Sequence, residues 1–421
     1  MNGPLGRIVA FFASMKLAVV VLVLLGLLTW LGTLAQVQKG LFVVQKEYFE
    51  GWFVIADLPL SFWGKELFAL RVPLPGAMPL MAVLFVNLIV GGFVRLRWSM
   101  RNVGVLITHL GIALLLVAGF VKLEYSTSGA VSLFEAAQDG GSDGGRVVRS
   151  GDYVSFHDYE LALLRDDGAT IVERTIPEDA LLPAKDRTVT ITDPDLPFRI
   201  ELHTWFDNCE PMQKGPMFAA SAPVVGGVFL RQFEVQPDRE LNVPGCYVIV
   251  TPNDGPRQEG MLWGRELRPQ TDLRLPFVFE VGSTRYALDL RRVMRELPFQ
   301  VQLKEFRKTD HPGTLTPADY RSFVTVFEAG KPPQDVQIYM NTPLRREGFV
   351  LYQTGWGPQD GRGAPDFTRG PPWYSVFEAA ENPSDKWPEY ACYVIALGLV
   401  VHFLMKLTRF LKSSTREALA S

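Results

Sequence analysis

The chain has 421 residues, of which 48% are hydrophobic, and its formal net charge is −3. A charge so close to zero excludes a protein that binds nucleic acid through a strongly basic surface, and so large an apolar fraction excludes a disordered chain. The apolar residues are gathered into blocks rather than spread evenly, which predicts a membrane protein in contact with the lipid bilayer.

Four apolar blocks are about long enough to cross a bilayer as helices, which takes roughly 20 residues. They cover residues 17–34, 77–94, 103–121 and 390–407. The first block lacks a small-residue cleavage site before polar sequence and is followed by further spans, so we expect it to be retained rather than removed as a signal peptide. The sequence therefore predicts four transmembrane helices, three in an N-terminal membrane domain, residues 1–121, and one near the C-terminus.

Basic residues flank those ends of the blocks that face one side of the membrane. Because cytoplasmic flanks carry an excess of Lys and Arg, this side is expected to be the cytoplasm. Both termini, with the tail 408–421, are then cytoplasmic in a protein of the inner (plasma) membrane. Segments 35–76 and 122–389 face the outer compartment, which is the periplasm in a cell with two membranes. The flanking residues are Arg7, Lys16, Arg95, Arg97, Arg101, Lys406, Arg409, Lys412 and Arg416.

The outer loop 35–76 is rich in aromatic residues and proline, interleaved with Lys and Glu. Aromatic rings of this kind prefer the headgroup level of a bilayer, so the composition predicts an amphipathic element at the membrane surface. A helix packed beneath the outer domain, or a surface that contacts a cofactor, would have a similar composition. All three interpretations stay open at this point.

Residues 122–389 are numerous enough to bury a core of their own. Runs such as 198–206, 246–252, 277–282 and 349–356 are rich in β-branched and aromatic residues, and Gly, Pro, Asn and Asp separate such runs. This pattern is typical of short strands joined by turns. The sequence therefore predicts a large extracytoplasmic, mainly antiparallel β domain between the third and fourth spans.

Familiar catalytic motifs are missing from the sequence. The three cysteines, Cys209, Cys246 and Cys392, form no C-x-x-C pair, so neither thioredoxin-type exchange nor covalent attachment of a c-type haem to this chain is indicated. Cys209 and Cys246 lie in the outer domain, where a disulfide and two buried thiols are both plausible. The chain also has no phosphate-binding glycine loop, no G-x-S-x-G and no H-E-x-x-H, so no catalytic residue is assigned.

Two of the five histidines lie inside predicted spans, and an ionisable residue at membrane depth is a functional-site hypothesis by default. His109 and His402 each lie about seven residues inside their spans, counted from the basic cytoplasmic flank. At roughly 1.5 Å per residue, both are expected near 10 Å depth in the membrane. Two imidazoles at one depth can ligate the iron of a haem held between helices, with no other metal expected. The alternatives are an imidazole bonded to a neighbouring helix for His109 and a snorkelling side chain for His402. His157, His203 and His311 are expected at the surface or in turns.

Four stretches of this chain are similar to the ResB family of System II cytochrome c maturation proteins, as is the order of spans and outer domain. The most specific stretch is the last, with an N-x-P-L turn followed by G-x-x-x-Y-Q on the returning strand. Asn341 and Pro343 are predicted to close a turn, Gly348 to permit a tight connection, and Tyr352 and Gln353 to alternate faces of a strand. A hairpin alone would explain these residues. The stretches are SMKLAVVVLVLLGLLTWLGTLAQ (14–36), THLGIALLLVAG (108–119), LPFQVQLKEFRKTDHPGT (297–314) and IYMNTPLRREGFVLYQTGW (338–356).

The resemblance implies a subunit of a cytochrome c synthetase that works with CcsA, a membrane protein with a tryptophan-rich haem-handling motif. Such a pair carries haem outward and joins it to the Cys-x-x-Cys-His motif of apocytochrome c, with the bond chemistry expected mostly on CcsA. This chain has no W-W-D sequence, which fits that division of labour. His109 matches the family's membrane histidine, which implies an axial ligand of haem b, with the second ligand from CcsA or from His402.

Two other functions stay open on sequence alone. One is a membrane adapter that docks an electron-transfer or cytochrome assembly without binding haem. The other is an envelope insertase-like factor, which also places a β domain beside a few spans. An insertase would need a polar groove in the membrane, yet the spans offer little beyond Asn87, Thr108 and His109.

Overall fold

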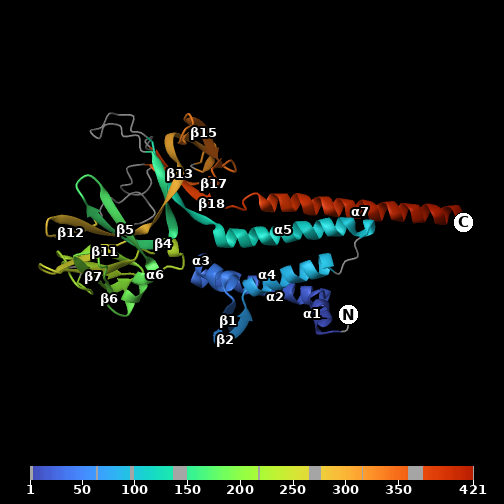
Figure 1. Cartoon of the computed structure of the whole chain (residues 1–421), viewed down its shortest axis with the longest axis horizontal. Coiled ribbons are helices and arrows are strands. Elements are labelled where there is room, and N and C mark those ends of the chain that lie inside the picture. The colour runs from blue at the N-terminus through green and yellow to red at the C-terminus, as the bar shows by residue number, and fades with distance from the viewer. Residues whose placement is uncertain are drawn as a thin grey trace. The chain divides into compact units, whose positions relative to one another are not determined.

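The computed structural model describes residues 3–62, 65–94, 99–135, 149–216, 219–264, 276–314, 316–358 and 373–420. The chain forms two compact units, whose elements are labelled in Figure 1. One unit contains Met1–Ser126 with Asn382–Ser421, and the other contains Thr127–Glu381. The first holds the apolar helices and the second holds the large β domain.

Three helices of the first unit are long and apolar enough to cross a membrane. They are α2 (Met15–Lys39), the helix Met100–Tyr125 that contains α5 (Val103–Tyr125), and Trp387–Lys412 within α7 (Trp387–Ala420). Two N-terminal spans and one C-terminal span therefore confirm a multi-pass membrane protein.

The second predicted block, residues 77–94, forms a shorter apolar helix than expected, Ala77–Phe93. It consists of α4 (Ala77–Ile89) followed by η2 (Val90–Val94), a π-helical turn that contains Gly91 and Gly92. Glycine weakens a regular helix because it loses more backbone freedom than other residues on folding. The described helix of this block is thus shorter than the other three, and its crossing of the membrane stays a prediction.

Asn87 on α4 closes a helix break at the start of the membrane unit. The short helix α1 (Pro4–Phe12) ends just before α2, and Ser14 caps α2 by accepting a hydrogen bond from the Lys16 amide. The Asn87 side chain is buried, and its Nδ2 donates to the carbonyls of Phe12 at 2.5 Å and Ser14 at 3.0 Å. Carbonyls at a helix end need such partners, so this polar residue stabilises the break between the two helices.

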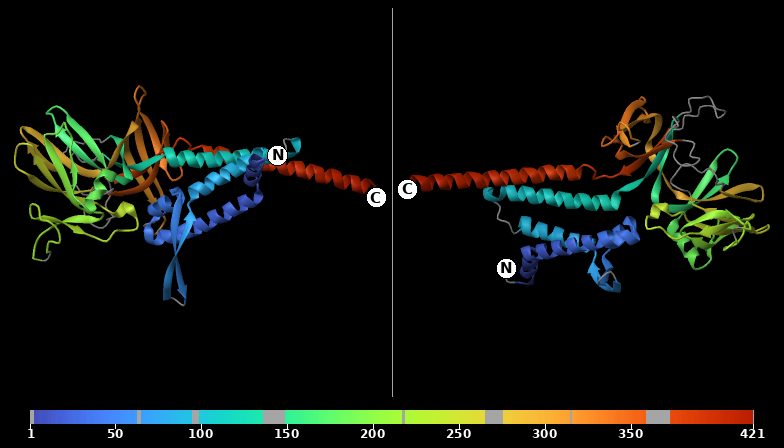
Figure 2. Two further views of the ribbon diagram at one scale, coloured as in Figure 1. Left: turned by 60° about the horizontal axis from the view of Figure 1, so that its bottom comes forward. Right: turned by 180° about the vertical axis from the view of Figure 1, so that it is seen from behind.

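The outer loop folds as short helical turns followed by a β-hairpin, which projects from the helices of its own unit (Figure 2). Val54 and Ala56 on the first strand are buried against Tyr48 and neighbouring helix residues, whereas Phe53 and Ile55 alternate with them and are exposed. These four residues of β1 therefore alternate between buried and exposed with the period of a strand. Its elements are α3 (Leu41–Val44), η1 (Gln45–Glu50), β1 (Phe53–Phe62) and β2 (Lys65–Pro75).

The second unit is built from antiparallel strands, as the sequence predicted. Its largest sheet has the order β15-β14-β13-β4-β3-β18-β17-β16 and is nearly closed, because β15 returns next to β17. The strands are β3 (Thr127–Phe134), β4 (Ser150–Asp166), β13 (Thr284–Asp310), β14 (Pro317–Phe327), β15 (Gln334–Tyr339), β16 (Leu344–Arg346), β17 (Phe349–Pro358) and β18 (Trp373–Glu381).

A second sheet, in the order β11-β10-β7-β6, packs on the far ends of the two longest strands. β5 flanks β4 and β12 flanks β13 at those ends, and β8 pairs with β9 in a separate small sheet. The additional elements are β5 (Ile171–Pro177), α6 (Glu178–Leu181), η4 (Leu182–Lys185), β6 (Val189–Ile191), β7 (Phe198–Phe206), β8 (Cys209–Gln213), β9 (Val228–Gln232), η5 (Arg239–Leu241), β10 (Gly245–Pro252), β11 (Gln258–Trp263) and β12 (Phe277–Val281).

The β unit has two large hydrophobic cores, and β4 and β13 run through both. On β13, Leu288 and Leu290 belong to the core between the two sheets, while Val301 and Leu303 belong to the core inside the nearly closed sheet. The 27-residue β13 is therefore one continuous strand that contributes side chains to both cores.

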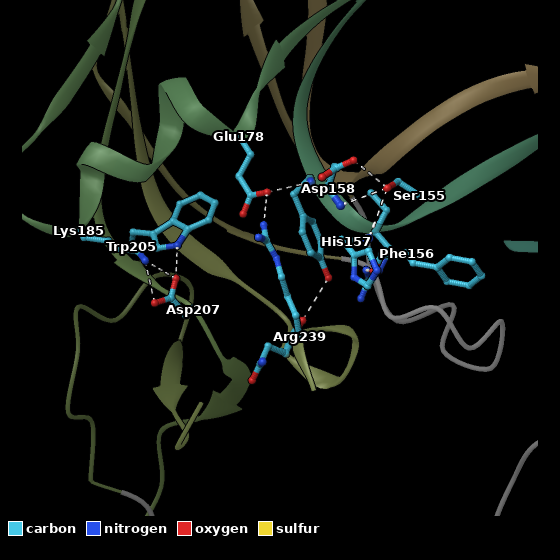
Figure 3. A network of polar contacts seen from close by, with 12 residues as sticks. Ser155, Phe156, His157, Asp158, Glu178, Lys185, Trp205, Asp207 and Arg239 are labelled. Carbon is cyan, nitrogen blue, oxygen red and sulfur yellow. Dashed lines mark hydrogen bonds and ion pairs between the residues drawn. The ribbon is translucent and has the colours of Figure 1, made fainter. Parts of the chain in front are cut away.

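A bulge in β4, residues 155–158, marks the passage from one core to the other, and a polar network holds it (Figure 3). The Ser155 hydroxyl donates to Asp158 at 3.0 Å and accepts from the Asp158 amide at 3.2 Å. Glu178 accepts hydrogen bonds from the Tyr159 amide and from Arg239. Since main-chain groups in a bulge lose their ladder partners, these side chains supply the missing hydrogen bonds.

Candidate functional site

His109 lies on α5 with its imidazole partly buried, and one ring nitrogen is committed to the helix's own backbone. Nδ1 lies 2.7 Å from the carbonyl oxygen of Val105, one turn earlier. Because a carbonyl oxygen can only accept, Nδ1 must carry the proton in this contact. A neutral imidazole then has its lone pair on Nε2, which is the form that ligates a metal.

The other side of the His109 ring packs directly on Gly92 in the π-helical turn η2. A β-carbon built on Gly92 would lie 2.6 Å from Cδ2 and 3.1 Å from Cγ of the imidazole. Real β-carbons essentially never come within 3.0 Å of a non-bonded heavy atom, so the ring occupies space that only glycine leaves open. The ring is therefore held between the Val105 carbonyl and the backbone of η2.

His402 lies on α7, and its backbone packs on α5. A β-carbon on Gly104 would lie 2.5 Å from the backbone nitrogen of His402, and one on Gly398 would lie 2.5 Å from that of Thr108. The level of His402 is thus that of Gly104, five residues before His109, or about 7 Å along the helix. Flank counting placed the two histidines at one depth, but the packing of these helices sets them at different levels.

The membrane unit can offer one imidazole ligand from His109 to a metal-containing group. Among the residues that the structure describes, no three His, Cys, Asp or Glu side chains are grouped as a complete metal site. A single neutral imidazole with a free Nε2 fits one axial position of a haem, which needs no further protein ligand on that face of the ring. The donor chemistry at His109 therefore fits the group that the sequence resemblance implies.

In the β unit, the predicted turns of the N-x-P-L stretch are present. Asn341 has a φ of 59° in the tight turn after β15, and the Tyr339 and Thr342 backbones exchange hydrogen bonds across it. Glu347 and Gly348, with φ of 46° and 85°, connect β16 to β17 in a two-residue hairpin. Positive φ at both central positions is the geometry of the tightest hairpins, which confirms the role assigned to Gly348.

Tyr352 and Gln353 point to opposite faces of β17, as predicted. Tyr352 is exposed, whereas both polar atoms of the Gln353 amide are buried and have no hydrogen-bond partner within the described ranges. Further along the strand, Trp356 stacks on Phe306 of β13 at 5.4 Å between centroids, and the Lys308 ammonium lies 4.9 Å from the Trp356 ring. The two stretches 297–314 and 338–356 therefore meet across the interior of the nearly closed sheet.

The similarity to a known family lies in this part of the β unit, from β12 to the end of β17. Residues 279–369 match the ResB-like family. The match confirms the resemblance seen in the sequence, and it contains both stretches that meet at Trp356. His109 and His402 lie outside the matched residues. No curated protein matches the chain.

Two of the cysteines, Cys209 on β8 and Cys246 on β10, are free and buried. Cys246 packs in the core between the sheets, whereas Cys209 packs with Tyr247 on the opposite face of β10. Burial raises the pKa of the Cys209 thiol to about 12 and raises that of Cys246 as well. Neutral buried thiols are poor nucleophiles, so neither residue provides a redox site.

The three histidines of the β unit occupy structural positions. His311 is exposed in the turn after β13, as predicted. His157 belongs to the bulge network, with Nε2 3.7 Å from Glu240, and His203 stacks on Tyr247. Burial lowers the pKa of His203, which keeps its ring neutral near pH 7.

Sequence reasoning missed two features of these sites. Gly92 was counted only as part of an apolar block, although two successive glycines inside a helix are a signal of close backbone approach. The buried, unpartnered amide of Gln353 could not be foreseen, because strand alternation predicts which face a side chain takes but not its hydrogen bonds.

Proposed function

We propose that this chain is the ResB-like subunit of a cytochrome c synthetase. It handles haem at the membrane and supports the covalent attachment of haem to apocytochrome c, together with a CcsA-like partner that carries the W-W-D motif. The observation that carries the proposal is the ResB-like match over residues 279–369. The three spans support it, because haem crossing a bilayer needs a membrane-embedded carrier.

In this proposal His109 is an axial ligand of haem b through Nε2. The Val105 carbonyl holds the proton on Nδ1, which keeps the lone pair on Nε2. When bound, the haem supplies an iron that must be reduced and the vinyl groups that join to the cysteine thiols. The chain's own contribution is to bind and orient the group within apolar helices that exclude water.

The second axial ligand is proposed to come from the partner rather than from His402. The backbone of His402 packs at the level of Gly104, so its ring starts about one and a half turns from His109. A ligand pair across the subunit boundary makes haem binding depend on assembly, which fits a machine that works only as a complex.

The orientation proposed from the basic flanks places both termini in the cytoplasm and the β unit outside. Arg101 and Lys412 lie at the same end of the antiparallel helices α5 and α7 and support this orientation, and Arg409 donates to the Arg101 carbonyl there. Arg95 and Arg97 lie outside the described residues.

Deletion of the gene tests the function. Cells that lack this protein should lose covalently bound haem in all c-type cytochromes on haem-stained gels, while b-type cytochromes and other membrane proteins stay at normal levels. A general loss of membrane proteins would support the insertase-like alternative and contradict our proposal. Normal c-type cytochromes in the deletion strain would contradict it as well.

A further inference from the structure

We infer that Gly92 is a positioning residue for His109, which holds the imidazole so that Nε2 can face the haem iron. This inference rests on the proposed ligand role of His109. It concerns a residue outside the family match and outside every motif of the sequence, and it assigns a role to the π-helical turn η2.

The His109 ring contacts the η2 backbone at Gly92. The Gly92 backbone is buried, and a β-carbon there would lie 2.6, 3.1 and 3.4 Å from Cδ2, Cγ and Cβ of His109. Cδ2 is the ring carbon bonded to Nε2, so the atom that Gly92 touches is next to the proposed ligand nitrogen. A side chain at position 92 must push this edge of the ring away.

The opposite edge of the ring cannot yield without breaking its hydrogen bond. Nδ1 is 2.7 Å from the Val105 carbonyl, and that bond fixes both the ring's orientation and its tautomer. A ring displaced by a new β-carbon loses the bond, so the proton is no longer held on Nδ1 and Nε2 moves from its place. The glycine and the carbonyl therefore act together on one imidazole.

The π-helical turn explains why a glycine pair lies here. Such turns widen a helix by one residue, and they recur at functional sites. In this turn Gly92 faces α5, while a β-carbon on the adjacent Gly91 would meet only the backbone of Ala13, at 3.7 Å. Position 91 has room for a methyl group and position 92 has none, which provides a matched control within one turn of helix.

The test compares three variants, Gly92→Ala, Gly91→Ala and His109→Ala, in the full-length chain purified with its CcsA-like partner. The readout is the absorption spectrum of bound haem, in the oxidised and reduced states, at equal amounts of assembled complex. We expect Gly92→Ala to lower the low-spin Soret signal by at least about threefold, the consequence of a lost hydrogen bond at the ligand. Gly91→Ala should match the wild-type spectrum.

Gly92→Ala can also fail to assemble, and a second variant then decides. If the clash is with the imidazole, the double variant Gly92→Ala, His109→Ala regains assembly, because removing the ring frees the space. A wild-type spectrum in assembled Gly92→Ala, or an assembly defect that the double variant does not relieve, overturns the inference. An unchanged spectrum in His109→Ala alone shows instead that the proposed ligand is wrong, and the inference fails with it.

Discussion

The contact between α5 and α7 makes a sharp prediction at Gly104, which lies where the two helices approach most closely. Replacing it by alanine places a methyl group 2.5 Å from the backbone nitrogen of His402, 2.7 Å from its Cα and 2.8 Å from the Gly398 carbonyl. All three are backbone atoms, which cannot rotate out of the way as a side chain can. The Gly104→Ala variant can be accommodated only if the helices separate.

The cost follows from these distances. Ordinary contact begins at 3.4 Å, so α7 must move by about 0.9 Å along this line. Overpacking of this kind costs about 1–3 kcal/mol, and the better helix propensity of alanine returns about 0.5–1 kcal/mol. From the middle of each range, we expect the free energy of unfolding to fall by about 1 kcal/mol. Close backbone packing is the main source of helix association in lipid, so little else offsets the loss.

The assay is unfolding of the purified protein in detergent micelles by added sodium dodecyl sulfate, followed by circular dichroism. Gly119→Ala on the same helix is the matched control, because a β-carbon there has no atom within 4 Å. The control should be as stable as the wild type or slightly more stable. Equal midpoints for Gly104→Ala and Gly119→Ala would refute the packing argument.

Three further predictions concern buried polar groups. Cys209 and Cys246 are buried, so they should resist iodoacetamide at pH 8 in the native protein and react after unfolding. Their raised pKa values mean that the folded state holds the thiol protons more tightly than the unfolded state does. The stability that the thiols contribute is therefore present below about pH 8.5 and is lost as the pH rises towards 12. Asn87→Leu should cost about 1–2 kcal/mol, because it removes the side-chain donor to the Phe12 carbonyl and leaves the Ser14 carbonyl with only the Ala18 amide. Arg292→Met should cost about 3 kcal/mol in thermal unfolding, because its buried guanidinium donates to the carbonyls of Phe156 and Glu240.

A specific result would contradict each of these three predictions. Rapid labelling of the native β unit in a Cys392→Ser background would show that the two thiols are accessible. A wild-type midpoint for Asn87→Leu would mean that the break between α1 and α2 does not need its amide. For Arg292, the exposed Arg257 is the control. If replacing either residue lowers the free energy of unfolding equally, the hydrogen bonds of Arg292 at the bulge do not stabilise the β unit.

The long apolar helices and the antiparallel β unit could be predicted, because composition and alternation report burial directly. α2, α5 and α7 are continuous apolar stretches, and strands such as β17 alternate as expected. The short α4 was harder, since hydropathy counts Gly91 and Gly92 as apolar although they end the regular helix in a π-helical turn. A hydropathy window therefore locates an apolar segment more accurately than it locates the residue at which the helix ends.

The candidate site could be predicted only in part. The cost of an imidazole in lipid was enough to single out His109 from the sequence. The relation of His109 to His402 was not, because counting from basic flanks ignores how helices interlock, and the close approach at Gly104 and Gly398 sets a different register. The tautomer of His109 and its contact with Gly92 depend on side-chain geometry between separate helices, which no one-dimensional pattern carries.

The haem-ligand role of His109 is the central claim, and one measurement tests it directly. The full-length chain is purified with its CcsA-like partner as the wild type, as His109→Ala and as His402→Ala, and the Soret absorbance per assembled complex is compared. We predict that His109→Ala loses or shifts the band while His402→Ala retains it. A band of unchanged position and intensity in assembled His109→Ala would contradict the central claim.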